Sequence, residues 1–128
     1  VLVQTRWKPD QDPVYSGTLE IPAGGIKTYE NVYDAVRREV LEETGLRVIG
    51  FRPDVRTKVY SPRDDGAFAF LPFCCQQQTR AGIPRVGFVF VCTVEDGEPA
   101  AGEGEVPATC LGLSGPLPAA IVLSWIIW

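Results

Sequence analysis

Several stretches of the chain alternate between apolar and polar residues, or are short and apolar, as β-strands are. We expect strands at residues 1–6, 18–21, 47–51, 55–60 and 67–75. Loops rich in Pro, Gly and Asp separate them at residues 8–17 and 62–66, and residues 23–25 predict a flexible turn after Pro22. The pattern therefore indicates a chain that is mostly sheet.

The strongest strand prediction covers residues 87–94, a continuous β-branched and aromatic run of the kind that is buried on both faces. We expect it to be a central strand. Residues 95–107 are acidic and rich in Gly and Pro, which predicts a loop. Residues 119–128 fit either a helix or a last strand, and their pattern does not decide between the two.

One segment changes to helical spacing. From about Asn31 onward, Val32, Val36 and Val40 recur every four residues, and Gly45 follows where a left-handed helix stop is expected. The chain is therefore predicted to be α/β, with one clear helix set among strands.

Size and charge narrow the class of protein. The 128 residues, 45% of them hydrophobic, suffice for one domain over residues 1–128. The 12 basic and 16 acidic residues give a net charge of -4 without a long run of either sign, which argues against nucleic acid as a partner. An acidic protein that handles phosphates needs a cation, because carboxylates and phosphates repel each other.

The cysteines and the terminal residues indicate the cellular compartment in which the protein is expected. Cys74 and Cys75 lie in an apolar run, so we expect buried, reduced thiols and a cytoplasmic protein. Neither these nor Cys92 and Cys110 have the spacing of a zinc site, and the sequence contains no histidine. No stretch approaches the roughly 20 apolar residues of a membrane span, and the chain opens without a basic leader. We therefore expect neither a membrane segment nor a signal peptide.

Three glutamates share one side of the predicted helix. At about 100° per residue, Glu43 falls within roughly 40° of Glu39, and Glu42 lies about 60° to the other side. Val32 and Val36 point in nearly the same direction as Glu39 and Glu43, so the carboxylates continue the face that should turn inward.

Such a cluster is unfavourable on its own, since like charges at this spacing cost about 0.2 to 0.5 kcal/mol per pair. A bound divalent cation would remove the cost. The alternative is an ordinary solvated helix face, on which Arg37 and Arg38 pair with the glutamates.

The stretch from Gly24 to Leu46 resembles the Nudix box, the signature of the Nudix hydrolases. Its fixed positions are all filled. They are Gly24, Glu30, Arg38, Glu39, Val40, Glu42, Glu43, Gly45 and Leu46. The resemblance implies an α/β/α sandwich with a mixed sheet and the box as loop, helix and loop, and it implies that strands which usually open the domain are absent before Val1.

The resemblance also implies a metal site. Glu39 and Glu43 resemble the family's ligands for Mg²⁺ or Mn²⁺, Glu42 shares the inner or outer shell, and a carbonyl of Ala23 or Gly24 adds a backbone ligand. Mg²⁺ prefers hard oxygen ligands, and it is normally held by a few carboxylates together with substrate phosphates.

Four further box residues have supporting roles by resemblance. Arg38 orients the glutamates, and Glu30 is a second carboxylate near the loop. Gly24 and Gly45 provide backbone shape. In charge-assisted networks of this kind the outer residues hold the ligands in place.

The implied reaction is attack of a metal-activated water on phosphorus, with a carboxylate as the base. Its products are a nucleoside monophosphate and a phosphorylated remainder. The family varies the base between box glutamates and an acidic residue of a late loop. The late candidates are Glu103 and Glu105, for which a solvated loop carboxylate is an equally good interpretation.

The substrate is a small nucleoside diphosphate derivative by resemblance. The lead-in from Glu20 to Gly24 is similar to that of ADP-ribose and nucleotide-sugar pyrophosphatases, which makes Glu20 a candidate substrate-binding residue, and Pro62 lies where that subfamily tends to carry proline. The alternatives are a nucleoside triphosphate pyrophosphohydrolase and a nucleotide-sugar sensor without catalysis. Many related enzymes of the ADP-ribose type are homodimers, so the resemblance also allows a homodimer here.

Overall fold

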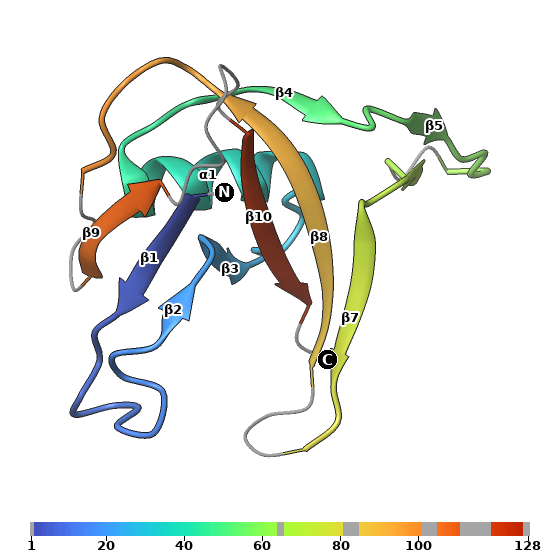
Figure 1. Ribbon diagram of the computed structural model, residues 1–128. Coiled ribbons are helices and arrows are strands. Elements are labelled where there is room, and N and C mark those ends of the chain that lie inside the picture. Colours follow the sequence, from blue (N-terminus) through green and yellow to red (C-terminus); the bar gives the residue numbers. More distant parts are fainter. Residues whose placement is uncertain (1, 64–65, 81–84, 101–104, 111–118, 127–128) are drawn as a thin grey trace.

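The computed structural model describes residues 2–63, 66–80, 85–100, 105–110 and 119–126, the last two stretches by their backbone alone. The elements follow one another along the chain as shown in Figure 1. They are β1 (Leu2–Arg6), β2 (Leu19–Glu20), β3 (Ala23–Gly25), α1 (Val32–Thr44), β4 (Val48–Arg52), β5 (Arg56–Lys58), β6 (Phe68–Phe70), β7 (Cys74–Gln78), β8 (Arg85–Val94), β9 (Glu105–Cys110) and β10 (Ala119–Ile126).

The described strands form three sheets. The largest has the order β3-β10-β8-β4, and β7 pairs with the other half of β8. Strand β10 runs parallel to β3 and antiparallel to β8, so the sheet is mixed. A second sheet has the order β2-β1-β9, and β5 and β6 form a two-stranded arm that extends from the body in Figure 1. The α/β class and the mixed sheet are as predicted.

Helix α1 packs against strands of both larger sheets, with contacts to β3, β4, β9 and β10. Its valines at four-residue spacing are buried, together with Tyr33 and residues of β4 and β8 such as Phe51 and Phe90. The ring centroids of Tyr33 and Phe51 lie 4.8 Å apart in an edge-to-face arrangement, which favours aromatic pairs. Among the described residues α1 is the one helix, and it is not a candidate for crossing a membrane.

The predicted central strand is β8, which has β10 on one side and β4 and β7 on the other. Its side chains alternate mostly between buried and half-buried, so one face is covered more fully than the other. The described part of the undecided segment, residues 119–126, is the strand β10, because its backbone pairs with β8 along this whole length.

Two loop predictions are wrong. Residues 23–25 form β3, since their backbone pairs with β10. The predicted loop at residues 95–107 ends earlier, because β9 begins at Glu105 and pairs with β1 despite Pro107. A register shift in that pairing accommodates the proline, as β-bulges do.

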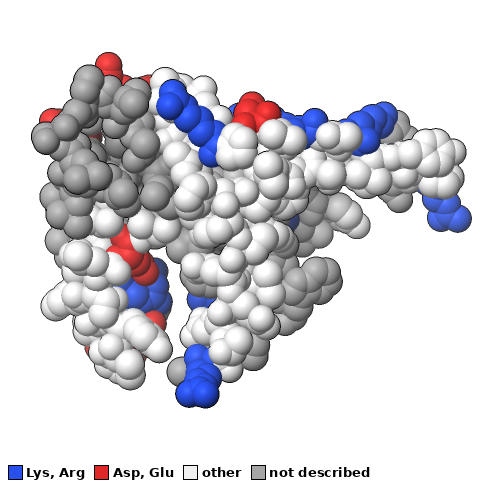
Figure 2. Space-filling model, turned by 45° about the vertical axis from the view of Figure 1, so that its right-hand side comes forward, with Lys and Arg blue, Asp and Glu red and all other residues white. Residues whose placement is uncertain are grey.

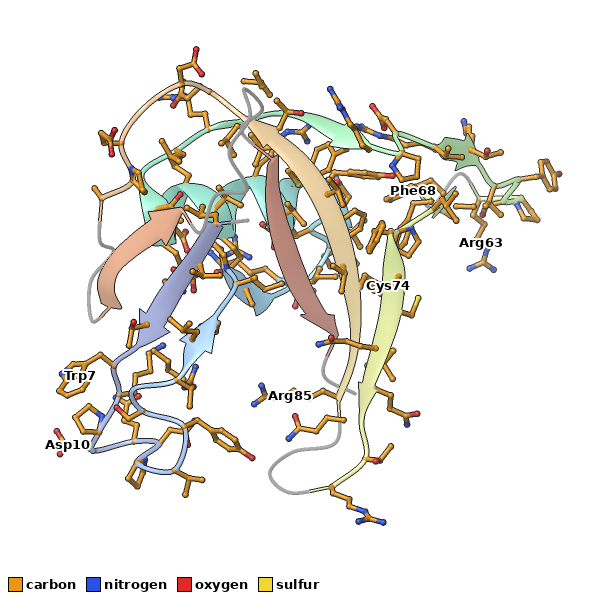
Figure 3. The ribbon with its side chains drawn as sticks, viewed as in Figure 1. Trp7, Asp10, Arg63, Phe68, Cys74 and Arg85 are labelled. Atoms are coloured by element: carbon orange, nitrogen blue, oxygen red, sulfur yellow. The ribbon has the colours of Figure 1, made fainter. Side chains whose placement is uncertain are left out.

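The prediction of buried Cys74 and Cys75 is also wrong, since both are exposed free thiols on β7, where Figure 3 labels Cys74. Their strand pairs with the Arg85–Val89 half of β8, whereas most of the buried residues of β8 belong to its other half. An apolar neighbourhood in sequence does not ensure that another layer covers the strand. Cys92 on β8 is the buried thiol among the described cysteines.

Candidate functional site

The box folds as strand β3, a loop and helix α1. Asn31 begins the helix: its side-chain oxygen accepts hydrogen bonds of 3.0 Å from the backbone N–H groups of Tyr33 and Asp34. Gly45 ends it with φ of 72°, and its N–H donates to the carbonyl of Leu41. Gly45 therefore has the backbone role that was predicted for it.

The three helix glutamates differ in exposure. Glu39 and Glu43 are half-buried, at the edge of the face that carries the valines, whereas the Glu42 side chain is 55% exposed. The predicted inward placement therefore holds for two of the three carboxylates. Glu42 points toward solvent.

Strand β3 passes very close to the helix at Gly24. A Cβ on this residue would overlap the carboxylate of Glu39, so close approach of backbone and side chain requires glycine here. Gly25, the next residue, has open space around the corresponding position. Gly24 thus determines how near the Glu39 carboxylate lies to β3.

Arg38 is the centre of the charge network. Its Nε and Nη2 atoms donate to the two oxygens of Glu30, each at 2.8 Å, in a bidentate pair. Nη2 also donates to the carbonyl of Gly25 at 2.9 Å, and Nη1 donates to Glu39 and, at 3.3 Å, to Glu42. One guanidinium therefore joins the loop, the strand and two carboxylates of the helix.

The network shifts the titration of its members. The hydrogen bonds from Arg38 lower the pKa of Glu30 to about 2, although desolvation opposes them, and a backbone N–H from Lys27 at 2.9 Å adds to the effect. The bond to Glu30 in turn raises the pKa of Arg38. Glu30 is therefore ionised throughout the neutral range.

Glu43 is held by the two strands β3 and β1. Its Oε2 atom accepts hydrogen bonds of 3.0 Å from the backbone N–H of Ala23 and from Nε2 of Gln4. Gln4 is 1% exposed on β1 and was missed from the sequence. The sequence does contain a signal for it. Gln4 lies two residues after Leu2, so both side chains face the interior on β1, where a polar residue is uncommon.

The donor set suits the metal implied by the box. Glu39, Glu42 and Glu43 offer carboxylate oxygens, which are hard ligands of the kind that Mg²⁺ and Mn²⁺ prefer. In the conformation described, however, these carboxylates bind Arg38, Gln4 and Ala23, and no group of three or more His, Cys, Asp or Glu side chains in the described part of the chain is gathered to hold a metal. Metal binding at Glu39 and Glu42 would compete with their hydrogen bonds from Arg38.

Two of the remaining candidates, Glu20 and the backbone of Glu105, lie on the sheet beside the box. Glu20 on β2 forms an ion pair of 3.4 Å with Arg6 of β1. The backbone of Glu105 pairs with that of Arg6, and its side chain, like all of Glu103, lies outside the described residues. The structure thus brings Glu20 and the backbone of Glu105 to one strand, β1.

A cleft of about 620 Å³ opens between the β1–β2 loop and the adjoining ends of β7 and β8. Figure 2 shows the notch between these parts, with acidic and basic side chains together on its wall. Arg6 binds Asp12 at 3.0 Å there, and the labelled Arg85 in Figure 3 is directed toward the β1–β2 side. The lining residues are Arg6, Gln11, Asp12, Tyr15, Thr18, Glu20, Gln78 and Arg85.

Comparison with known proteins gave consistent matches. The model of the NUDIX domain family matches residues 1–111. The nucleoside triphosphatase NudI of Salmonella schwarzengrund (strain CVM19633) and that of Salmonella agona (strain SL483) are each 31% identical over 80 residues, which cover 56% of this chain and 57% of the relative. NudI of Escherichia coli O139:H28 is 29% identical over the same length. The match thus spans little more than half of these relatives, and no solved structure matched.

Proposed function

Since the chain belongs to the Nudix hydrolase family, we propose that it hydrolyses a phosphoanhydride bond of a nucleoside phosphate with Mg²⁺ or Mn²⁺ as cofactor. The observation that carries the proposal is the carboxylate face of α1. Glu39 and Glu43 lie half-buried at this face, Glu39 against Gly24 of β3, and Arg38 binds Glu39 and Glu42 while it is itself held by Glu30.

Glu39, Glu42 and Glu43 would hold the cation, with a carbonyl of Ala23 or Gly24 as a backbone ligand. When bound, the cation neutralises phosphate charge and makes a coordinated water more acidic. Arg38 keeps the carboxylates in place, because its own position is determined by the bidentate pair with Glu30 and by the carbonyl of Gly25.

The hydrolysis needs a base that takes a proton from the attacking water while the bond from phosphorus to the leaving oxygen breaks. Among the three helix carboxylates we propose Glu42. Its side chain is 55% exposed and has one contact of 3.3 Å to Arg38, so it can reach water more readily than Glu39, whose side chain is 12% exposed. Glu105 is the second candidate because β9 lies beside β1, and Glu103 is the third.

The cleft is the proposed place for the nucleoside. Its volume of about 620 Å³ lies within the range usual for small-molecule sites, roughly 300 to 1,000 Å³. Tyr15 offers a half-exposed ring for a base, and Arg85 adds a positive charge to the lining, whereas the charge of Arg6 is offset by Asp12 and Glu20. Glu20, three residues before β3, lines the cleft and would accept hydrogen bonds from the nucleoside.

Nucleoside triphosphates are the substrate class that we favour, since the relatives are nucleoside triphosphatases. ADP-ribose and nucleotide sugars are the second class, and the lead-in from Glu20 to Gly24 is what supports them. To bind the ribose of either class, the carboxylate of Glu20 would have to exchange its partner Arg6, which it binds at 3.4 Å. Homodimer formation and a cytoplasmic location remain predictions.

The test is product release from a panel of nucleoside triphosphates, ADP-ribose, nucleotide sugars and dinucleoside polyphosphates, with Mg²⁺ or Mn²⁺. Glu43→Gln is compared with Glu98→Gln, a control with the same chemical change at an exposed residue outside the box. We expect metal-dependent turnover of one class that is lost in Glu43→Gln and kept in the control. Metal-dependent binding without turnover across the panel would reject hydrolysis and favour a sensor.

A further inference from the structure

Gln4 is a buried polar residue beside the carboxylate face that does not belong to the box. Buried amides normally satisfy both their nitrogen and their oxygen. Nε2 of Gln4 donates to Oε2 of Glu43 at 3.0 Å, whereas Oε1 has no hydrogen-bond partner among the described residues. Within the described part of the chain, this buried carbonyl oxygen next to Glu43 therefore has no donor.

The orientation of this amide follows from its partner. A carboxylate oxygen accepts hydrogen bonds, so the NH₂ group must face Glu43 and Oε1 must occupy the other position. The acceptor role of Oε1 is thus a consequence of the bond to Glu43.

The backbone supports the inward position of Gln4. On one side Gln4 pairs with Glu20 of β2. On the other side the register between β1 and β9 shifts between Val3 and Thr5, because Val3 pairs with Thr109 and Thr5 pairs with Val106. Such irregularities turn side chains and are common next to functional sites. Gln4 lies at this shift, and three strands determine its direction.

We propose that Gln4 is a positioning residue of this site. Its amide nitrogen holds Glu43 toward β3, and its carbonyl oxygen accepts a hydrogen bond from a water in the hydration shell of the cation. The proposal rests on the proposed function, in which the helix glutamates hold Mg²⁺. Mg²⁺ keeps several of its waters, and polar groups behind them orient those waters as well as the ligands. A single planar amide can do both.

The first test uses the unaltered protein and does not depend on turnover. The side-chain NH₂ cross-peak of Gln4 is followed by NMR while Mn²⁺ is added below one equivalent, with Gln77, exposed on β7, as internal control. We expect broadening of the Gln4 peak well before that of Gln77. Equal, non-selective broadening, or none at Gln4, would overturn the proposal.

The second test compares Gln4→Met with Gln77→Met. Methionine is close to glutamine in size and removes both the donor and the acceptor. In Gln4→Met we expect about a 10- to 100-fold loss in Mn²⁺ affinity and in kcat, with KM within about threefold, because the group acts through Glu43 and not on the nucleoside. Wild-type metal affinity in a folded Gln4→Met would contradict the proposal, and if this variant does not fold, the NMR titration decides.

The two proposals can fail separately. Selective broadening of Gln4 together with weaker Mn²⁺ binding in Gln4→Met, without hydrolysis of any substrate, would keep the role of Gln4 and reject the hydrolase. Turnover that is lost in Glu43→Gln but unchanged in Gln4→Met would support the hydrolase and reject the role of Gln4.

Discussion

The carboxylate of Glu39 occupies the space that a Cβ on Gly24 would need. Strand β3 and helix α1 approach each other closely at this point, and a side chain at position 24 would prevent the approach. Position 24 is therefore glycine. The residue beside it, Gly25, has no atom within 4 Å of its corresponding Cβ position, so it provides a matched control.

Gly24→Ala is expected to displace Glu39 and to lower kcat about 10- to 100-fold, since ligand positions tolerate little movement. Gly25→Ala should leave kcat within about twofold of wild type. Steady-state kinetics and thermal unfolding of both variants check this. Equal activity of the two alanine variants would mean that Glu39 is not needed where the structure has it.

Arg38→Lys is expected to disable the network, because an ammonium cannot form the bidentate pair with Glu30 and still reach Gly25 and the two helix carboxylates. We expect kcat to fall about 10- to 100-fold and the free energy of unfolding to fall by about 2 kcal/mol. Arg47→Lys is the control: Arg47 is exposed and pairs with Glu95 at 3.9 Å, and this change should cost less than about 0.5 kcal/mol. Similar losses of kcat and of unfolding free energy in both variants would show that the network around Arg38 contributes no more than a surface ion pair.

The low pKa of Glu30 makes stability depend on pH. Its pKa in the folded protein is about 2, below the ordinary value of 4.5, so its contribution is full above pH 4.5 and is lost as the pH falls toward 2. Glu30→Gln should therefore reduce the free energy of unfolding by about 1 to 2 kcal/mol at pH 7. The difference from wild type should shrink at pH 3. Urea unfolding at both pH values measures it, and a difference that grows at pH 3 would have the wrong sign.

The cysteines should react at very different rates. Cys74 and Cys75 are exposed, whereas Cys92 is fully buried and its burial raises the thiol pKa to about 12. In the folded protein at pH 8, we expect a maleimide to modify Cys74 and Cys75 and to leave Cys92 intact until the protein is unfolded. Peptide mass spectrometry identifies the sites. Early modification of Cys92 would contradict the packing of β8.

The box helix could be predicted in detail, because its information is local. The valine spacing, the capping Asn31 and the stop at Gly45 lie within one short stretch, and helix geometry alone puts Glu39 and Glu43 at the edge of the buried face.

What could not be predicted depends on contacts between distant segments. Gln4 and Glu43 are 39 residues apart, and only the placement of β1 beside α1 joins them. Strand β9, which begins at Glu105 in a Pro-rich and Gly-rich segment, likewise forms because its backbone pairs with β1. The exposure of Cys74 depends on whether another layer covers β7, and the local composition does not reveal this.

The cleft leads to a prediction about substrate binding that is independent of the metal site. Tyr15 lines the cleft and is 46% exposed, and stacking of a base on an aromatic ring contributes about 1 to 3 kcal/mol. Tyr15→Ala should therefore raise KM for a nucleoside triphosphate at least about fivefold and leave kcat within about twofold, because stacking acts equally on the ground state and the transition state. Tyr60→Ala, on the arm and 87% exposed, removes a ring of the same size outside the cleft and should change neither constant. Steady-state kinetics with the preferred substrate compare the variants: a KM that rises in both would indicate a general effect on the fold, and a KM unchanged in Tyr15→Ala would mean that the base binds elsewhere.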